Sequence, residues 1–236
     1  MNMKNLFSLN KILNEQLSGT LPKPGKTNLD WYFFCLFLDE FNANNLEMGV
    51  GFGGSALTME SFSKKLTLVD DWSQTWSLSD CINYFDESIT KFISCSSHDF
   101  KSDDTSWDFI HIDAHKDYEG TFLDLQVCEK LNPTVICVDD FLQSMWYGIS
   151  HAVFDFCKKS QYNLSFVGNH QVFLMKKNES KSLKKIVTYF PVRVWNDTVF
   201  LTYGEYPKNK ILEEFINKAS LSYTWFNKDR NGVFYV

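Results

Sequence analysis

Residues 44–59 read NNLEMGVGFGGSALTM and hold four of the eleven glycines of this 236-residue chain: Gly49, Gly51, Gly53 and Gly54. Glycine is needed where a strand turns sharply into a helix and where a ligand must come close to the backbone. The stretch therefore predicts a strand at 45–49, a ligand-binding turn, and a helix at 55–64. The alternative is a tight turn that binds nothing.

The acidic residues around this turn bear on which ligand it suits. The glycines fit both the G-x-G-x-x-G pattern of dinucleotide binders and the E-x-G-x-G-x-G pattern of S-adenosylmethionine (SAM) binders. The carboxylate of Glu47 would repel a pyrophosphate but complement the amino group and sulfonium of SAM. Asp70 ends the next apolar segment, where an acid can accept both ribose hydroxyls, and Asp71 is the alternative ribose partner. Ser55 and Trp72 lie next to these positions and are further candidate contacts for the cofactor.

Strand-like and helical segments alternate along residues 28–177. This alternation predicts an α/β protein with a doubly wound parallel sheet and one antiparallel strand at its edge. The further strands are expected at 65–71, 91–97, 107–113 and 133–140. The other helices are expected at 28–41, 77–89, 118–131 and 149–160, followed by a hairpin at 164–177.

The pattern changes after Lys177, so we divide the chain into a domain of residues 1–177 and a small α+β appendage of residues 178–236. The appendage carries nine basic and six acidic residues, a net charge of +3, whereas the rest of the chain carries −9. Its sequence predicts two strands joined by an Asn-Asp turn, then a helix and a second hairpin. Its aromatic content suits a wall of the acceptor pocket or a homo-oligomer interface: Trp195, Tyr203, Tyr206 and Trp225.

Three further acids follow two of the predicted strands. Asp113 ends one strand, and Asp139 and Asp140 end another. The carboxyl ends of parallel strands line one crevice, so these carboxylates are expected to meet beside the glycine turn. Carboxylates that share a site repel one another unless a divalent cation neutralises them, and oxygen ligands suit Mg²⁺, Mn²⁺ or Ca²⁺. The alternative is that these acids only cap the following helices.

The loop after Asp113 contains two candidate bases, His115 and Lys116. A nearby cation and partial burial would lower the pKa of Lys116 and allow it to act as a general base; otherwise it is a surface residue. Asp113 is also a candidate cofactor contact, because its strand ends beside the turn. Ser97 is expected at the adenine edge, and His111, inside a strand, at the core or the crevice wall.

The composition excludes several classes of protein. The net charge is −6 and the chain has only two arginines, so we expect no nucleic-acid partner. The longest apolar run, WYFFCLFL, is too short to span a bilayer, so we expect no membrane partner. Cysteines occur singly, without a C-x-x-C pair, which favours reduced thiols and a cytoplasmic location.

These motifs together resemble class I SAM-dependent methyltransferases, most closely the metal-dependent O-methyltransferases that act on catechols and macrolide sugars. The resemblance covers about residues 28–177 and implies a seven-stranded Rossmann-like sheet with an antiparallel last strand. It is carried by the segments LEMGVGFGGS, LTLVDDW, FIHIDAHKDYEGTFLDL and VICVDDF.

The resemblance also implies roles for single residues. Glu47, Gly49, Gly51 and Gly53 match the SAM motif and Asp70 the ribose acid, while Asp113, Asp139 and Asp140 match the metal ligands. Asp113 and Lys116 resemble the metal ligand and catalytic lysine of the catechol enzymes, which have asparagine in place of Asp140. Many relatives have D-G-D-H where this chain has DAHK, which leaves both His115 and Lys116 open as the base.

The sequence therefore predicts a SAM- and Mg²⁺-dependent O-methyltransferase that acts on a small hydroxylated molecule. In this hypothesis the metal binds two acceptor oxygens and a base removes the hydroxyl proton before in-line methyl transfer. One alternative is a protein that binds SAM without transferring its methyl group. The other alternative is an NAD-dependent oxidoreductase that uses the same glycine turn.

Overall fold

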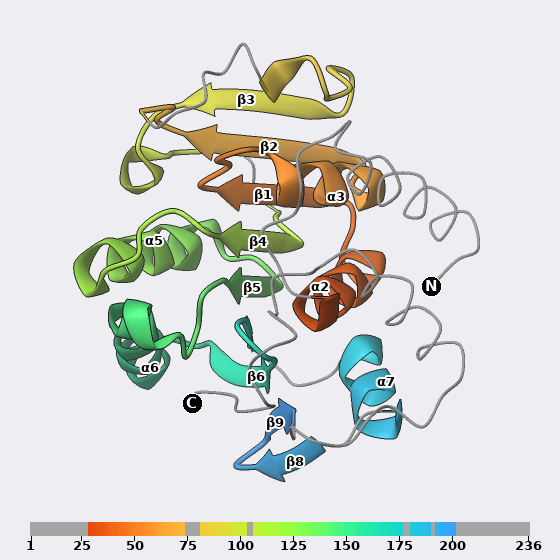
Figure 1. The fold of residues 1–236 in the computed structure, drawn as a ribbon, viewed down its shortest axis with the longest axis vertical. Coiled ribbons are helices and arrows are strands. Elements are labelled where there is room, and N and C mark those ends of the chain that lie inside the picture. The colour runs from red at the N-terminus through yellow and green to blue at the C-terminus, as the bar shows by residue number, and fades with distance from the viewer. Residues whose placement is uncertain (1–27, 74–80, 103–105, 177–179, 190–191, 202–236) are drawn as a thin grey trace, which may run out of the picture.

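The computed structural model describes residues 28–73, 81–102, 106–176, 180–189 and 192–201 (Figure 1). The longer helices are α2 (Asn28–Glu40), α3 (Gly54–Phe62), α5 (Tyr118–Leu131), α6 (Tyr147–Lys159) and α7 (Lys181–Tyr189), and the 3-10 turns are η1 (Ser97–Asp99) and η2 (Ser144–Trp146). The strands are β1 (Asn44–Met48), β2 (Lys65–Asp70), β3 (Thr90–Ser94), β4 (Phe109–Ile112), β5 (Val135–Val138), β6 (Asn163–Val167), β7 (Val172–Met175), β8 (Val192–Trp195) and β9 (Thr198–Leu201).

These strands form one sheet in the order β3-β2-β1-β4-β5-β7-β6-β9-β8. The first five strands are parallel to one another, and β7 is antiparallel to both β5 and β6. The order of the strands in the sheet reverses between β1 and β4, which pair with each other along their length. In a doubly wound sheet such a reversal opens a crevice at the carboxyl ends of the strands.

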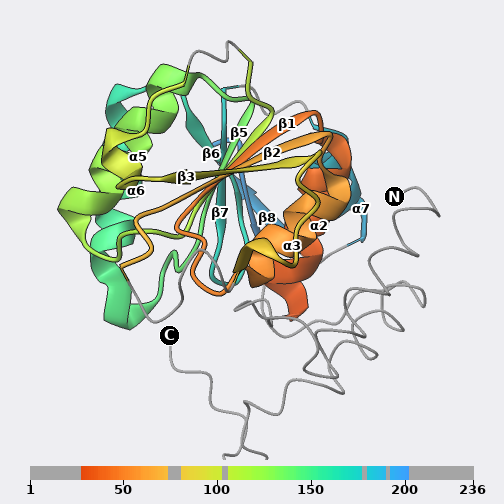
Figure 2. The same cartoon turned by 90° about the horizontal axis from the view of Figure 1, so that it is seen from above.

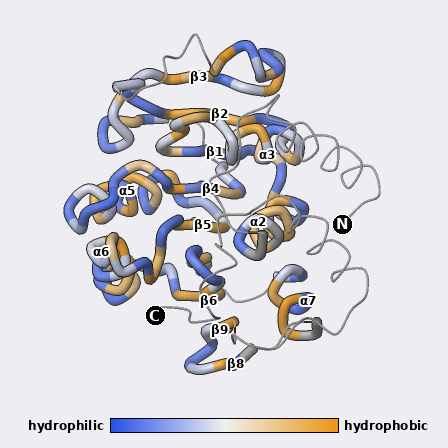
Figure 3. Tube along the Cα trace, viewed as in Figure 1, coloured by the Kyte–Doolittle hydropathy of each residue, from blue (hydrophilic) through white to orange (hydrophobic). Residues whose placement is uncertain are grey.

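Helices cover both faces of the sheet, and each face has its own apolar core. Figure 2 shows α5 and α6 on one face and α2, α3 and α7 on the other. The first core packs residues of α5 and α6, such as Leu125 and Phe156, under the sheet. The second core contains a cluster of phenylalanines, in which the rings of Phe37 and Phe173 stack with centroids 4.1 Å apart. Figure 3 shows the apolar character of α2 and β5, which belong to this buried interior.

The predicted α/β fold, in which the seventh strand is antiparallel, is confirmed. The predicted place of that strand at the edge of the sheet is wrong, because β7 lies between β5 and β6. The sheet of the described residues continues by two strands beyond the predicted seven, because β9 pairs with β6 in parallel and with β8 in a hairpin. The predicted Asn-Asp turn joins these two strands, with φ of 46° at Asn196 and 63° at Asp197. Two positive φ angles are the geometry that a tight hairpin requires.

The helix predicted at 77–89 is wrong over its described second half. Residues 83–89 form turns, because the carboxylate of Glu60 accepts hydrogen bonds from Asp86 N at 2.8 Å and Thr90 Oγ1 at 2.5 Å. Asp86 in turn accepts from Ser88 N, which closes a side-chain turn in place of a helical one. The helix and second hairpin predicted after Leu201 lie outside the described residues.

Two buried or half-buried acids of α2 fix distant segments to the helix. Asp30 is 1% exposed and its Oδ1 accepts a hydrogen bond of 2.9 Å from His170 N, in the turn between β6 and β7. Glu40, at the other end of α2, accepts from Lys181 N at 2.8 Å and from Ser182 N at 2.6 Å. These are N–H groups of the first turn of α7, which a helix leaves without internal partners. The acids therefore bind the two ends of α2 to segments about 140 residues away in the sequence.

The described helices are all too short or too polar to cross a lipid bilayer. Among the described residues, which include all six cysteines, no disulfide is formed.

Replacing Asp30 with alanine should destabilise the protein by about 1–3 kcal/mol, because the partly buried N–H of His170 loses its acceptor. Chemical denaturation of the two proteins measures this change. Asp155, on α6, provides the control, since D155A removes only exposed contacts, an ion pair with Lys158 and a hydrogen bond from the hydroxyl of Tyr118, and should change little. Equal midpoints for D30A and D155A would show that the α2 contact contributes nothing.

The contact between Glu40 and α7 should weaken in acid. Burial alone would raise the pKa of Glu40, but hydrogen bonds from Lys181, Ser182 and Ser180 outweigh it and lower the pKa. A lowered folded-state pKa contributes stability that is present at neutral pH and is lost as the pH falls through it. We expect thermal unfolding to show a stability gap between wild type and E40Q that narrows on acidification. E87Q, an exposed control, should show no such gap; a gap independent of pH would contradict the assignment.

Candidate functional site

The glycine turn and the acids lie at one edge of the sheet, where the parallel strands end. Backbone hydrogen bonds align these ends: Gly49 N donates to Val69 O at 2.9 Å, Asp113 N to Met48 O at 2.8 Å, and Asp139 N to Ile112 O at 3.0 Å. The first residue after each of β1, β4 and β5 is therefore held beside the neighbouring strand. This alignment is the convergence that the sequence predicts.

The glycine turn uses three left-handed residues. Gly49, Gly51 and Gly53 have φ of 83°, 50° and 77°, a region that side chains disfavour. A Cβ atom on Gly49 would lie 2.5 Å from the backbone of Ala114, so this glycine also allows the turn to approach the loop after β4. A Cβ atom on Gly51 would meet nothing within 4 Å. The turn is thus packed on one side and open on the other.

Asp70, the predicted ribose acid, is bound to the glycine turn itself. Its Oδ2 accepts hydrogen bonds from Val50 N at 2.7 Å and Gly51 N at 3.1 Å, and its Oδ1 accepts from Trp72 N at 2.7 Å. Trp72 has a φ of 54° and packs against the apolar core near Phe92. Asp70 therefore sets the position of the two backbone N–H groups at the open side of the turn.

Glu47 lies below the turn and is fully buried. Its Oε1 accepts a 2.5 Å hydrogen bond from Ser55 Oγ, in the first turn of α3, and lies 2.8 Å from Nδ1 of His111, on β4. One carboxylate thus connects β1, the helix after the glycine turn, and the strand that leads to Asp113. Ser55 and His111 therefore hold the carboxylate of Glu47 in place.

The structure brings two of the predicted metal ligands together and adds a histidine. Ligand atoms of Asp113, Asp139 and His111 all lie within 4.8 Å of one another. Asp139 is 8% exposed, and Asp140 has a φ of 58°. Asp140 belongs to the same group through Lys116, whose Nζ is 2.5 Å from Asp140 Oδ2 and also contacts Asp113 Oδ1.

The pKa of Lys116 moves in the opposite direction from that expected beside a bound cation. Burial alone would lower this pKa, but the negative charges of Asp113 and Asp140 outweigh it and raise the pKa. In this arrangement Lys116 is an ammonium ion that neutralises the two carboxylates. The predicted lowering would require another positive charge at the acids.

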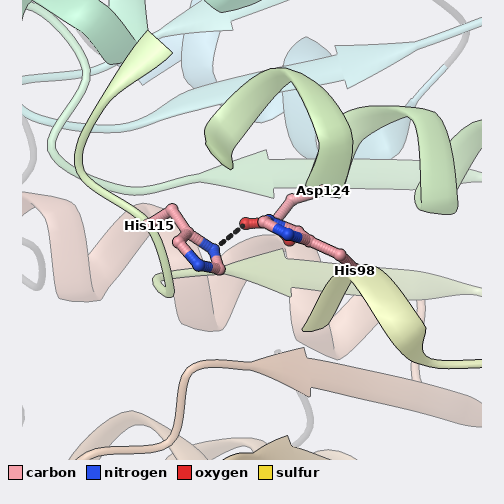
Figure 4. Close-up of side chains that lie close together, drawn as sticks. All are labelled: His98, His115 and Asp124. Atoms are coloured by element: carbon pink, nitrogen blue, oxygen red, sulfur yellow. Dashed lines mark hydrogen bonds and ion pairs between the residues drawn. The ribbon is translucent and has the colours of Figure 1, made fainter. Parts of the chain in front are cut away.

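His115, the second candidate base, faces away from these acids. Its Nδ1 is 3.1 Å from Asp124 Oδ2 and 3.3 Å from Ser97 Oγ, and a hydrogen bond with Asp124 raises the pKa of His115. Its ring stacks on His98 with centroids 4.0 Å apart (Figure 4). Ser97, the predicted adenine contact, is buried beside this pair. The neighbours His115 and Lys116 therefore belong to two different groups of side chains.

Two members of these groups carry no sequence signal of their own. Asp124 is one of several acids in an amphipathic helix, and only packing shows that its side chain is fully buried. His111 is one residue in an apolar strand, and its contact with Glu47 depends on the pairing of β1 with β4.

Large apolar side chains are exposed in loops at the same edge of the sheet. One belongs to the glycine turn, two to the segment between β5 and α6, and one is the first residue of α6, and they are from 54% to 70% exposed: Phe52, Leu142, Met145 and Tyr147. Exposed apolar groups that gather near polar ones are typical of ligand-binding surfaces.

Known proteins resemble this chain in structure but not in sequence. No protein-family model and no curated protein matches the sequence. A protein assigned as a caffeoyl-CoA O-methyltransferase from Staphylococcus aureus is 15% identical, with a TM-score of 0.53 over 75% of this chain and 100% of its own.

Two further structures have a similar fold. An O-methyltransferase from Bacillus cereus, solved with S-adenosylhomocysteine (SAH), is 14% identical, with a TM-score of 0.51 over 72% of this chain and 90% of its own. A protein assigned as an RNA methyltransferase from Pyrococcus horikoshii is 11% identical, with a TM-score of 0.52 over 70% of this chain and 98% of its own. The chain therefore has the Rossmann-like fold of class I methyltransferases. At these identities the likeness concerns the fold, and the named acceptors differ.

Alanine at Gly49 should destabilise the protein more than alanine at Gly51. Both substitutions place a side chain at positive φ, which costs about 1–2 kcal/mol. Gly49→Ala adds a collision with the backbone of Ala114, whereas Gly51→Ala projects into open space. Denaturant midpoints measure the difference, and equal losses for the two variants would show that the contact with Ala114 is not as close as described.

Proposed function

We propose that this protein is a SAM-dependent methyltransferase that transfers a methyl group to a hydroxyl oxygen of a small molecule with the help of a divalent cation, Mg²⁺ by preference. The observation that carries the proposal is the group of Asp113, Asp139, Asp140 and Lys116 beside the glycine turn. The fold, shared with the B. cereus O-methyltransferase solved with SAH, supports the choice of cofactor.

The glycine turn would hold SAM at its open side. A Cβ atom on Gly51 would meet nothing within 4 Å, and Asp70 stands beside this glycine as an acceptor for ribose hydroxyls. Ser97 would face the adenine edge, and Trp72 would pack beside the nucleoside. In this assignment Glu47 acts by holding the turn and α3 in place, because its carboxylate is buried beneath them.

The acids fit a divalent cation by their chemistry. Asp113 and Asp139 supply carboxylate oxygens within 4.8 Å of each other, and Asp140 is linked to the same group by Lys116. Such oxygen ligands suit Mg²⁺, while a nitrogen of His111 would also admit Mn²⁺ or another transition ion. A bound cation would supply positive charge that lowers the pKa of an acceptor hydroxyl.

Lys116 is the residue best placed to contact the acceptor oxygen. Its ammonium group lies among the acids, whereas His115 faces Asp124, so we assign the acceptor contact to Lys116. Taking the hydroxyl proton would require Lys116 first to lose its own. The exposed apolar residues of the neighbouring loops would hold the body of the acceptor and exclude water from it.

The same contacts favour a second function. Lys116 already neutralises Asp113 and Asp140, and Asp70 is already hydrogen-bonded to the glycine turn. A protein that binds SAM and transfers no methyl group would need neither a cation nor an acceptor. Methyl transfer that depends on a divalent cation would distinguish the proposed enzyme from a protein that only binds SAM.

Titration calorimetry with SAM, with and without Mg²⁺, should show binding, and a panel of catechols and hydroxylated sugars should yield a methylated product only with Mg²⁺. D139N should reduce turnover more than about 100-fold, because it removes a cation ligand, while SAM binding is retained. D155N, a surface substitution, should behave as wild type.

SAM binding without turnover in any condition would favour the binding protein. Binding of NADH in place of SAM would overturn both functions and favour an oxidoreductase. Turnover that D139N leaves unchanged would remove the acids from the mechanism.

A further inference from the structure

A second group of metal-ligating side chains lies outside the acids of the proposed active site. We call it the His–His–Asp cluster; it consists of His98 in η1, His115 in the loop after β4, and Asp124 in α5 (Figure 4). One ligand atom from each of the three lies within 4.8 Å of the other two. Nothing in the proposed methyl transfer uses His98 or Asp124.

The carboxylate of Asp124 is buried and faces both rings. Its Oδ2 is 3.1 Å from Nδ1 of His115, and its Oδ1 is 3.4 Å from Nε2 of His98. Among the described residues Oδ1 accepts no hydrogen bond, although the Asp124 side chain is 0% exposed. A buried carboxylate oxygen is costly without a partner. The position therefore suits a positive charge between the carboxylate and the rings.

We propose that the His–His–Asp cluster is a binding site for a divalent transition metal ion, with Zn²⁺ as its simplest occupant. Two imidazole nitrogens and one carboxylate are the ligand types that Zn²⁺ takes in proteins. Bonds of about 2.0–2.1 Å in a tetrahedron place neighbouring ligands about 3.3 Å apart. The separations from Asp124 are of this size, 3.1 Å from Oδ2 to Nδ1 of His115 and 3.4 Å from Oδ1 to Nε2 of His98, so each nitrogen lies at ligand spacing from one oxygen of the carboxylate.

The ion would replace the hydrogens that now lie between the rings and their acceptors. Nε2 of His98 is 3.2 Å from the carbonyl oxygen of Gly120, which only accepts, so this nitrogen carries a hydrogen in the metal-free arrangement. Each ring can carry its hydrogen on the other nitrogen when it ligates an ion. The rings would also turn from their stack, whose planes meet at 24°, so that both nitrogens face the ion.

The site is accessible and differs in chemistry from the acids. The side chains of His98 and His115 are 26% and 37% exposed, so an ion can enter from solvent. Gly120 leaves room for the ring, since a Cβ atom there would lie 2.4 Å from Cβ of His115. Nitrogen ligands favour Zn²⁺, Co²⁺ or Ni²⁺ over Mg²⁺.

An ion at this site would bind three segments of the chain to one another. These are the segment after β3, the loop after β4, and α5. The loop also carries Lys116, next to His115, so the ion would restrain the backbone at the acids without touching them.

The test uses the full-length protein after treatment with a chelator. The protein is titrated with Zn²⁺ in the presence of excess Mg²⁺, and calorimetry measures the binding. Wild type should bind one equivalent, and H98Q and H115Q should each weaken that binding at least about tenfold, because each loses one ligand. H151Q, which removes an exposed histidine of α6, should bind as wild type. His98 and His115 are partly exposed, so circular dichroism should show that H98Q and H115Q are folded. D124N is not used as the main test, because it changes a buried group on which folding can depend.

Co²⁺ absorption identifies the ligands. We expect bands of a nitrogen- and oxygen-ligated ion that disappear in H98Q and H115Q and persist in D139N. Thiolate charge-transfer bands would assign the ion to cysteines and overturn the proposal. Zn²⁺ binding that H98Q and H115Q leave unchanged, or that D139N abolishes, would overturn it as well.

Discussion

The rest of the site depends on the hydrogen bonds made by the buried carboxylate of Glu47. A charge with no exposed surface must be satisfied by nearby donors, and here Ser55 Oγ and His111 Nδ1 lie 2.5 Å and 2.8 Å from the same oxygen. These partners stand on α3 and β4, so the carboxylate fixes the helix after the glycine turn and the strand before Asp113 to the central strand β1. The geometry of the turn and that of the acids are therefore set by one interaction.

Charge balance explains how the acids can share one edge of the sheet. Asp113 and Asp140 both contact the ammonium group of Lys116, which offsets their repulsion and is itself held protonated by them. His115, the next residue toward the amino terminus, is paired with Asp124 on the opposite side of the loop. Two adjacent residues thus serve two separate groups of charges, and the loop between β4 and α5 is fixed from both sides.

The sequence predicted the fold where the signal is local. Local signals predicted the strand, glycine turn and helix at 45–64 and the helix at 118–131. These signals are the hydrophobic periodicity, the glycines of the turn and the Asp that precedes the second helix. The helix predicted at 77–89 was wrong from residue 83 onward, because Glu60, on another helix, accepts a hydrogen bond from the backbone N–H of Asp86. The pairing of β9 with β6 was also beyond prediction, since β7, α7 and β8 lie between the two strands in the sequence and their contact is long-range.

For the candidate site, the sequence by itself determined which residue types gather at the carboxyl ends of the strands, because parallel pairing brings those ends to one edge whatever the side chains are. Only the tertiary structure decided which atoms meet. It joined Lys116 to two acids, turned His115 toward Asp124 and His98, and placed His111 on Glu47. Those contacts depend on side-chain direction and on burial across strands far apart in the chain, and neither quantity is encoded in spacing along the sequence.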